Sequence, residues 1–468
     1  MLLKASSQSL TDQLAARFGE RIRNRLLAPG ARLPSVRQCA EQQGVSASTV
    51  VAAYDQLLAQ GLVEARKNRG FFVREAAGQE AAAGRPQRAA SARGPGPVNA
   101  TSLIRGMFHR AGHKPQPGMG VLPMEWLEST FLPAAVRKVT GTKALNAFSL
   151  QYGEPLGDAG LRRALSTKLA GLDVPVPPEH IITTVGATHA LDIVSRTLLR
   201  PGDPVMVEEP GWAVEFARLS ALGMHLLPVP RRADGPDLQV MAKYCEVHRP
   251  KLYVSVSVFH NPTSYCLSPG SAHRLLQLAS RYGFHIVEDD TYSHIAPAHA
   301  TRLAALDGLQ RTIYVGGFAK ILAPNWRIGF IAAPEALVEP LLDTKLLTTL
   351  TTPALLERAL AVCIDQGQLR RHSERIRTRL DLARSRSVKL ALQAGCRFVA
   401  EPAGLFGWVD TGVDTDALSQ RMLDEGYLLA PGALFHAQRK PSTLMRINFA
   451  TTQDAAFWKK YGELVKKP

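Results

Sequence analysis

Lys320 and Arg327 are the residues whose types and spacing most strongly suggest a chemical site, in which the lysine would form a covalent bond and the arginine would bind a phosphate. They lie in YVGGFAKILAPNWRIGF, where Lys320 follows an apolar run and Arg327 stands seven positions later. A lysine amine can bond covalently to a carbonyl compound, and a guanidinium can bind a phosphate through two parallel hydrogen bonds. A lysine by itself is far more often a surface residue, so this interpretation depends on polar groups elsewhere in the chain.

Polar residues that could hold a ring follow two other apolar runs. Asp289 and Tyr292 lie in FHIVEDDTYSHI, and Asn261 lies in SVFHNPTSY. A carboxylate can pair with the nitrogen of a pyridine ring, while Tyr292 and Asn261 can donate hydrogen bonds to a hydroxyl on that ring. Acids at strand ends are also common helix caps, and Asn-Pro is a common turn, so each signal has an ordinary structural alternative.

A third group of residues could bind a phosphate and cover the ring. Gly186, Ala187 and Thr188 of VGATHALDI stand where a helix is predicted to begin, and the free N–H groups of such a terminus attract anions. Trp212 of EEPGW could lie flat on the ring. The ordinary alternatives are a helix terminus without a ligand and a buried core tryptophan.

Together these groups supply what pyridoxal 5′-phosphate (PLP) requires: a lysine for its aldehyde, an acid for its pyridine nitrogen and donors for its phosphate. Their order and spacing resemble the fold-type I aminotransferases over roughly residues 115–455. The resemblance implies that Tyr152 of YGEPLGDAGLR reaches the phosphate of a neighbouring subunit, and hence that the protein is a homodimer. It also implies that Arg446 of LMRINFA binds the carboxylate of an amino acid.

Two residues depart from the pattern of that family. Gly317 stands three positions before Lys320, where relatives usually have a serine or threonine hydroxyl for the phosphate. Ser264 replaces the glycine that normally ends an N-P-T-G turn. We expect the first departure to bear on PLP affinity and the second to cost little, because the turn can accommodate a small residue.

The segments that carry these residues alternate between apolar strands and amphipathic helices from about Val98 onward. In chain order they are IITTV, HALDIVSRTLL, PVMVEEP, KLYVSVSVF, HRLLQLASRYG, FHIVEDD and TIYVGGF. Such alternation predicts a parallel sheet with helices on both faces. With the resemblance, it predicts a large α/β domain of the fold-type I PLP-dependent transferase kind with a smaller C-terminal α+β subdomain.

The first 75 residues have a different pattern. An apolar residue at every fourth position over 10–26 predicts a helix. Ser35 followed by Gln38 has the form of a capping box for a short second helix, and Ser46 is placed to cap a longer third one. Residues 62–73 then read as a two-stranded hairpin with a basic tip.

A short helix, a tight turn, a longer helix and a hairpin make a winged helix-turn-helix. The strings APGARLPSVR, VSASTVVAAYDQLLAQGLV and RGFFV resemble the GntR-type DNA-binding domain across nearly all of residues 8–74. Short polar groups at the start of the third helix can reach bases, and basic residues attract phosphates. The predicted contacts to double-stranded DNA are Arg37, Ser46, Ser48, Thr49, Arg66, Lys67, Arg69 and Gly70. On the pattern alone, a three-helix packing module without DNA is the alternative.

Residues 76–97 are dominated by Ala, Gly, Pro and Arg, which predicts a flexible linker. The predicted domains are therefore 1–75 for DNA binding, 76–97 as linker and 98–468 as the PLP-binding effector domain. This combination resembles the MocR group of transcription regulators, which implies that the aminotransferase fold senses PLP together with an amino acid or amine. Two alternatives remain: an active aminotransferase that carries a DNA-binding head, and a regulator whose site is empty or binds something else.

Composition limits the possible partners and compartments. The 468 residues carry a net charge of +16, which suits a polyanionic partner. The five cysteines include no C-x-x-C pair, so the sequence predicts neither a disulfide framework nor a metal site. No apolar run approaches the roughly 20 residues of a membrane span and no signal peptide is evident, so we expect a cytoplasmic protein without a membrane partner.

Overall fold

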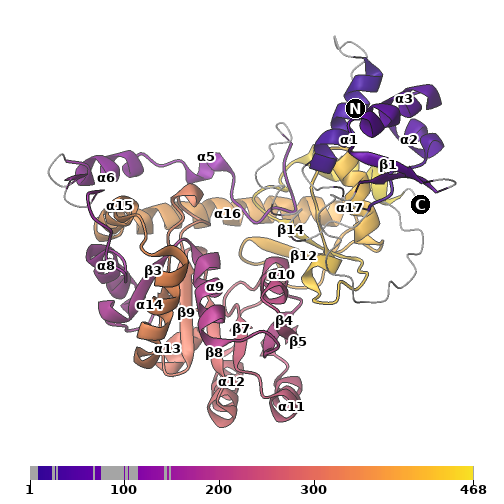
Figure 1. Ribbon diagram of the computed structural model, residues 1–468. Coiled ribbons are helices and arrows are strands. Elements are labelled where there is room, and N and C mark those ends of the chain that lie inside the picture. The colour runs from indigo at the N-terminus through magenta and orange to yellow at the C-terminus, as the bar shows by residue number, and fades with distance from the viewer. Residues whose placement is uncertain are drawn as a thin grey trace.

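The computed structural model shows a small N-terminal domain next to a larger α/β body (Figure 1). The predicted linker over 76–97 and the predicted DNA contact Lys67 lie outside the part of the chain that the structure describes. The described residues are 9–23, 27, 30–66, 69–74, 100, 104, 114–141, 145–146 and 149–466.

The N-terminal domain is a winged helix-turn-helix, as the sequence predicts. Ser35 accepts a hydrogen bond from the Gln38 amide at 3.3 Å, and Gly44 ends the second helix in the left-handed conformation with φ of 65°. Ser46 accepts from the Thr49 amide at 3.1 Å and so caps the third helix. The elements are α1 (Leu10–Arg23), α2 (Val36–Gln43), α3 (Ala47–Ala59), β1 (Val63–Arg66) and β2 (Gly70–Val73).

A single apolar core holds this small domain together. Leu14 and Phe18 of α1 pack on Val50, Tyr54 and Leu57 of α3, all of them buried. The Tyr54 hydroxyl donates to the Pro34 carbonyl at 2.9 Å, which satisfies its one polar atom inside the core. The helix-turn-helix is therefore a rigid unit.

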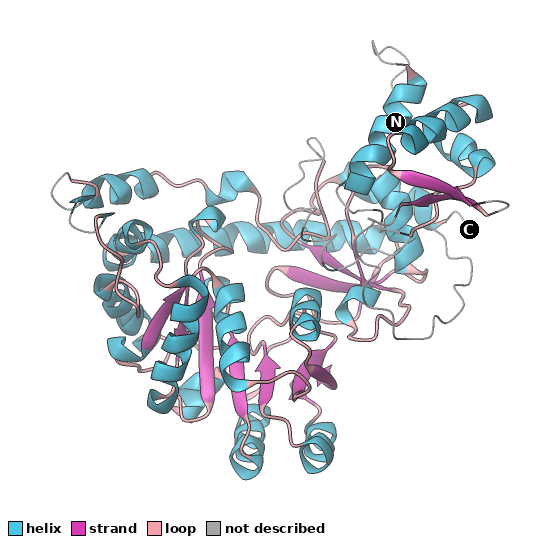
Figure 2. Cartoon of the chain, in the orientation of Figure 1, coloured by secondary structure: helices cyan, strands magenta, loops and turns pink. Residues whose placement is uncertain are grey.

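The large domain is built on one eight-stranded sheet in the order β3-β10-β9-β8-β7-β4-β5-β6. Successive side chains of its strands enter different cores: Val205 and Val207 pack on one face, and Met206 packs on the other. Figure 2 shows the strands in magenta with helices around them. The strands are β3 (Ile181–Thr184), β4 (Pro204–Glu209), β5 (His225–Arg232), β6 (Gly235–Pro236), β7 (Leu252–Ser255), β8 (His285–Asp289), β9 (Thr312–Gly317) and β10 (Gly329–Ala332).

The sheet is mixed, which corrects the prediction of a parallel sheet. Strands β5, β4, β7, β8 and β9 are parallel to one another, but β10 is antiparallel to both β3 and β9, and β6 is antiparallel to β5. A parallel return needs a crossover of a dozen or more residues, usually a helix. Residues 318–328, between β9 and β10, contain only the short 3-10 turn η3 (Pro324–Trp326), so the chain returns in the opposite direction.

Helices cover the sheet and extend beyond its edge. None of those in the described part of the chain is long and apolar enough to cross a membrane. They are α5 (Met124–Leu127), α6 (Phe131–Val139), α8 (Ala159–Ala170), α9 (Ala187–Leu198), α10 (Ala213–Ala221), α11 (Leu238–His248), α12 (Pro269–Tyr282), α13 (Leu303–Asp307), α14 (Glu335–Thr349) and α15 (Ala354–Asp365), with short turns η1 (Pro178–His180) and η2 (Ser293–Ile295).

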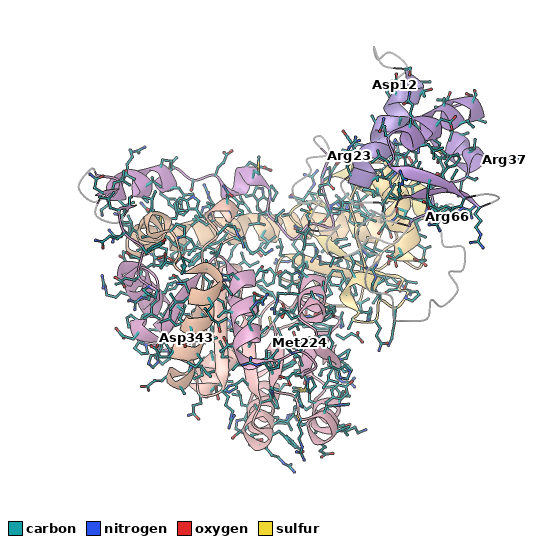
Figure 3. The ribbon with its side chains drawn as sticks, in the orientation of Figure 1. Asp12, Arg23, Arg37, Arg66, Met224 and Asp343 are labelled. Atoms are coloured by element: carbon teal, nitrogen blue, oxygen red, sulfur yellow. The ribbon has the colours of Figure 1, made fainter. Side chains whose placement is uncertain are left out.

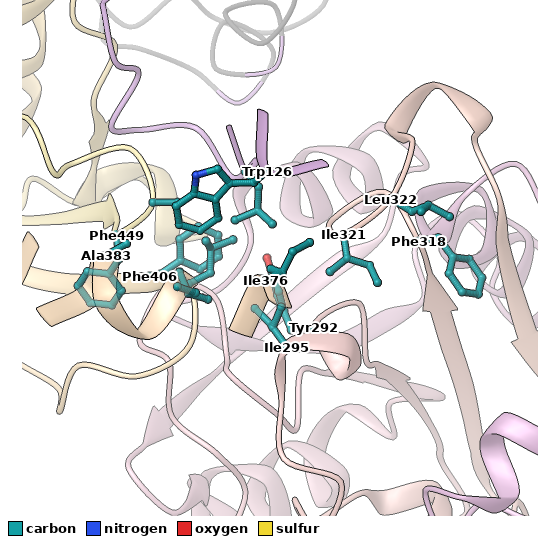
Figure 4. Packing of buried hydrophobic residues seen from close by; sticks show 14 of the residues in the cluster. Trp126, Tyr292, Ile295, Phe318, Ile321, Leu322, Ile376, Ala383, Phe406 and Phe449 are labelled. Carbon is teal, nitrogen blue, oxygen red and sulfur yellow. The ribbon is translucent and has the colours of Figure 1, made fainter. Parts of the chain in front are cut away.

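A smaller C-terminal α+β subdomain follows, joined to the rest by the long helix α16 (Gln368–Gln393) (Figure 1). One buried cluster spans the junction: Tyr292 and Ile321 from the large sheet pack with Phe406 and Phe449 (Figure 4). The two parts therefore share a core. The subdomain contains β11 (Arg397–Phe398), β12 (Phe406–Asp410), β13 (Ala430–Pro431), β14 (Leu444–Asn448), α17 (Thr415–Asp424), η4 (Gly432–Phe435) and α18 (Ala455–Val465).

Candidate functional site

The predicted site residues meet at one edge of the large sheet. Trp212, Asn261 and Lys320 lie in the segments that follow β4, β7 and β9, and Asp289 is the last residue of β8. Because these four strands are parallel, their carboxyl ends lie at the same edge, where ligands of α/β proteins usually bind. Sequence positions more than a hundred residues apart are thereby brought into one site.

A cradle for an anion forms where α9 begins. Gly186 precedes α9 with φ of 79°, and a Cβ atom placed on it would lie 2.5 Å from Arg327 Nη2. Arg327 Nη2 donates to the Val185 carbonyl at 3.2 Å, so the guanidinium is held beside the first N–H groups of the helix. Ala187 and the exposed Thr188 form its first turn. Free amides, a helix dipole and a guanidinium together fit a phosphate.

Gly317 lies at the back of this cradle. A Cβ atom on Gly317 would sit 3.4 Å from the Ala187 Cβ and 3.5 Å from the Ala187 backbone nitrogen, which is ordinary van der Waals contact. The position that a hydroxyl-bearing side chain would take is therefore open and next to a phosphate-binding amide. The glycine costs the site one donor and is not required by the packing.

Asp289 is a buried carboxyl group at the bottom of the site. Its side chain lines a cavity of about 30 Å³ together with Trp212, Glu215 and His260. Burial raises the pKa of Asp289 to about 6, the two hydrogen bonds from Thr291 oppose the shift, and the nearby carboxylate of Glu215 adds to it. A protonated pyridine nitrogen would supply the positive charge that this carboxylate lacks.

Arg446 lies deep in the site with its charge only partly compensated. Its Nη1 donates to Asn261 Oδ1 at 2.9 Å, and its guanidinium lies 4.4 Å from the Phe406 ring centroid and 5.2 Å from that of Phe435. Its buried Nε has no hydrogen-bond partner among the described residues, and burial lowers the pKa of Arg446 to about 10. A ligand carboxylate could accept a hydrogen bond from Arg446 Nε, the donor that has no partner among those residues.

Tyr292 and Lys320 are the predicted residues for the ring hydroxyl and the aldehyde. Tyr292 is buried against Phe406, burial raises its pKa, and its hydroxyl interacts with Asn261. Lys320 Nζ donates to the Gly120 carbonyl at 2.7 Å. Burial, with the positive charge of Arg446 as a second cause, lowers the pKa of Lys320 to about 8, so a sizeable fraction of the amine is neutral and nucleophilic near neutral pH.

Tyr152 does not join this cluster. Its side chain is 84% exposed, so a single chain leaves it without packing. Ser264 adopts the left-handed conformation with φ of 59° and donates to the Phe406 carbonyl at 2.8 Å, so serine adds a hydrogen bond in place of the expected glycine.

Figure 3 labels two of the DNA-binding candidates, Arg37 and Arg66, on the winged helix. Arg37, Ser48, Arg69 and Gly70 are exposed. Ser46 is engaged as the α3 cap and also bonds the Ser48 and Thr49 hydroxyls at 2.8 Å each. Arg66 donates to Glu64 at 2.6 Å and lies 4.6 Å from the Phe72 ring centroid, so the wing itself holds this arginine.

Sequence reasoning missed several residues that shape these sites. Arg32 lies beside the wing, with its Nε 3.5 Å from a Cβ placed on Gly70. Glu215 follows Trp212 by three positions on α10, a spacing that could have signalled it. The carbonyls of Gly118 and Gly120, which accept from Arg446 and Lys320, carry no side-chain signal at all.

Comparison with known proteins agrees with the assignment of both domains. The chain matches the aminotransferase class I and II family over residues 127–457 and the bacterial regulatory gntR family over residues 10–73. It is 26% identical to the HTH-type transcriptional regulator YisV of Bacillus subtilis, covering 91% of this chain and 90% of YisV. It is 32% identical to the probable rhizopine catabolism regulatory protein MocR of Rhizobium meliloti, covering 76% of this chain and 73% of MocR.

Solved aminotransferase structures share the large fold. LysN, an α-aminoadipate aminotransferase of Thermus thermophilus complexed with N-(5′-phosphopyridoxyl)-L-leucine, is 25% identical with a TM-score of 0.70. The match covers 78% of this chain and 94% of that structure. With the fit of the cradle and of Asp289, these matches identify PLP as the cofactor of the large domain.

Asp289 predicts a pH dependence of cofactor binding. Since its folded-state pKa of about 6 lies above the ordinary 3.8, the neutral form stabilises the fold in acid, and this contribution is lost as pH rises through 6. PLP should restore it, so the rise in Tm on adding PLP should be larger at about pH 7.5 than at about pH 5. In Asp289→Asn the PLP-induced rise in Tm should differ less between the two pH values. The phosphate of PLP titrates in the same way with both proteins, so its effect cancels in the comparison. An unchanged difference would show that Asp289 does not contact the ring nitrogen.

A serine in place of Gly317 should raise the affinity for PLP. Gly317→Ser should tighten PLP binding by about tenfold, because a hydrogen bond to a charged group contributes roughly 1.5–3 kcal/mol. Gly317→Ala is the matched control, with the same Cβ atom and no hydroxyl, and should change affinity little. Fluorescence or absorbance titration with PLP measures both. Equal behaviour of the two variants would show that the position does not face the phosphate.

Arg37 predicts the electrostatic part of DNA binding. Arg37→Ala should weaken binding to the DNA upstream of the protein's own gene and reduce the salt slope of log K by about one, because one phosphate contact is lost. Arg386→Ala, an exposed arginine of α16, is the control for net charge alone. Equal salt slopes for the two variants would place Arg37 outside the interface.

Proposed function

Because the chain belongs to the MocR-type regulators, in which a GntR-family DNA-binding domain precedes a class I and II aminotransferase domain, we propose that it changes its binding to an operator when an amino compound occupies the PLP site. The observation that carries this proposal is the pairing of Lys320 and Arg446 in one desolvated site within a chain that also presents a helix-turn-helix. An amino acid carries the two groups that such a site selects, an amine and a carboxylate.

Each residue of the site has a distinct part in this proposal. PLP supplies an aldehyde that reacts with amines and a ring that withdraws electrons. Lys320 holds the aldehyde position with an amine of lowered pKa, and Asp289 keeps the ring nitrogen protonated. Gly186, Ala187, Thr188 and Arg327 bind the phosphate. Arg446 selects ligands that carry a carboxylate.

Trp212, Tyr292 and Asn261 orient the ring. Trp212 lines the cavity beside Asp289, where it can cover one face of the ring. Tyr292 and Asn261 interact with each other beside Arg446 and can both reach a ring hydroxyl. Their burial excludes water from the place where the amine of an effector would arrive.

The proposal extends to assembly and organisation. A homodimer explains the exposed Tyr152, which would then reach the phosphate of the neighbouring subunit. We assign DNA binding to residues 1–75, the linker to residues 76–97 and the effector domain to residues 98–468. The residues that contact the operator are Arg37, Ser48, Thr49, Arg66, Lys67, Arg69 and Gly70. Ser46 orders the start of α3. We place the protein in the cytoplasm, where its operator lies.

Active transamination is the second candidate, because the site holds a lysine, an acid, a phosphate cradle and a carboxylate-binding arginine. The similarity in fold to LysN favours this candidate. The match to gntR-family regulators over residues 10–73 favours regulation, since an enzyme has no use for a DNA-reading head. We therefore expect turnover to be slow beside that of a metabolic aminotransferase.

Ligand-dependent operator binding tests the proposal. An amino compound that perturbs the absorption spectrum of bound PLP should change operator affinity by about 5- to 150-fold, the usual range of coupling between sites. Lys320→Ala and Arg446→Ala should each blunt this response and leave the winged helix able to bind DNA, whereas Lys389→Ala, at an exposed lysine of α16, should keep the response. Fast turnover combined with an operator affinity indifferent to every such ligand would establish the enzyme instead.

A further inference from the structure

Residues 114–121, KPQPGMGV, form a segment that runs from the candidate site to the turn after α17, and we call it the strap. Pro115 and Pro117 restrict its backbone, because the proline ring locks φ. Asn448 of β14 anchors it: Asn448 Nδ2 donates to the carbonyls of Met119 and Val121 at 2.9 and 2.7 Å. A stiff segment with hydrogen bonds at both ends can transmit a displacement.

One end of the strap holds two cations of the site, Lys320 and Arg446. Lys320 Nζ donates to the Gly120 carbonyl at 2.7 Å, and Arg446 Nη2 donates to the Gly118 carbonyl. A Cβ atom on Gly120 would lie 3.6 Å from Lys320 Nζ and 3.9 Å from Arg446 Nη2, so the strap passes directly over these two groups. Its carbonyls thus occupy donors that a ligand would use.

The other end of the strap pairs with the turn after α17. The Gly118 amide donates to the Leu428 carbonyl at 2.8 Å, and the Leu428 amide donates to Gln116 Oε1 at 3.1 Å. Lys114 Nζ donates to the Glu425 carbonyl at 2.6 Å. A Cβ atom on Gly118 would lie 2.4 Å from the Leu429 carbonyl carbon, so the strap and the turn touch backbone to backbone.

The end of α17, which leads into that turn, contacts the winged helix. Asp424, the last residue of α17, forms an ion pair with Arg21 of α1, in which the two side chains are 11% and 29% exposed for Arg21 and Asp424 respectively. Arg17, one turn earlier on α1, is close enough to Asp424 for the carboxylate to oppose the lowering of its pKa by burial. We call this contact the latch. It joins the DNA-binding domain to the C-terminal subdomain, while Arg37 and Arg66 are exposed.

We propose that the strap links the occupancy of the PLP site to the latch, so that a ligand carboxylate on Arg446 releases the winged helix from its fixed position against α17. The mechanism rests on the proposed function and adds its physical route. A carboxylate that binds Arg446 through both Nη2 and the Nε that lacks a partner among the described residues competes with the Gly118 carbonyl for Nη2. A cofactor on Lys320 competes with the Gly120 carbonyl for Nζ. A buried carbonyl that loses its donor is costly, so the strap shifts and the turn at 424–428 shifts with it.

Hydrogen exchange of the full-length protein tests the route without DNA. The probe is N-(5′-phosphopyridoxyl)glycine, which carries the phosphate and the carboxylate but no side chain to clash and no reactive aldehyde. Its addition should speed amide exchange in the strap, in residues 424–428 and in α1. In Asp424→Ala, α1 should exchange fast already and ignore the probe, whereas the strap still responds. Asp365→Ala, at the last residue of α15, is the matched control and should behave as wild type.

Operator affinity with the same probe then separates the two proposals. We expect a change of at least about fivefold in wild type, none in Asp424→Ala, and a restored change in the charge-swapped Arg21→Asp, Asp424→Arg double variant. An undiminished response in Asp424→Ala overturns the route but leaves the proposed function standing. An unchanged operator affinity in wild type with the exchange pattern present supports the route and counts against the proposed function, which the other amino compounds that perturb bound PLP then decide. Exchange in α1 that is unchanged by the probe overturns the route.

Discussion

Desolvation of charge is the constraint on which the large domain depends. Asp289, Lys320 and Arg446 are removed from water at the carboxyl edge of the sheet, and burial shifts the pKa of each toward its neutral form. Buried charges of this kind are stable only when hydrogen bonds or opposite charges compensate them. The protein supplies part of that compensation, and a cationic ring nitrogen, an aldehyde and a carboxylate would supply the rest. The same groups that lower the stability of the fold therefore select its ligand.

The backbone of the strap provides the compensation that the side chains lack. Carbonyl groups at Gly118 and Gly120 accept from the two cations, and glycine is needed at Gly118 because a side chain there would collide with the main chain of Leu429. Such hydrogen bonds are strong enough to order a segment and weak enough to be displaced by a charged ligand. This balance suits a sensor better than a static core.

The two binding functions use charge in opposite ways. The winged helix presents exposed basic groups around a packed core centred on Tyr54, so its attraction for DNA comes from many weak and salt-sensitive contacts. The large domain places a few charged groups in a dry site, where each interaction is stronger and more selective. Only the ion pair between Arg21 and Asp424, both partly buried, connects charge in one domain with charge in the other among the described ion pairs.

Local rules determined much of this protein from the sequence alone. The caps at Ser35 and Ser46, the alternation of strands and helices, and the placement of Asp289 and Lys320 at strand ends follow from hydrogen bonding and hydrophobic periodicity within short windows. The pairing of Arg446 with Asn261, 185 positions away, and with Gly118, 328 positions away, was decided by the tertiary structure. So were the antiparallel course of β10 and the latch. Contacts between residues so far apart leave no pattern within a short window of sequence. A backbone partner such as the Gly118 carbonyl leaves no side-chain signal at all, because any residue offers the same carbonyl.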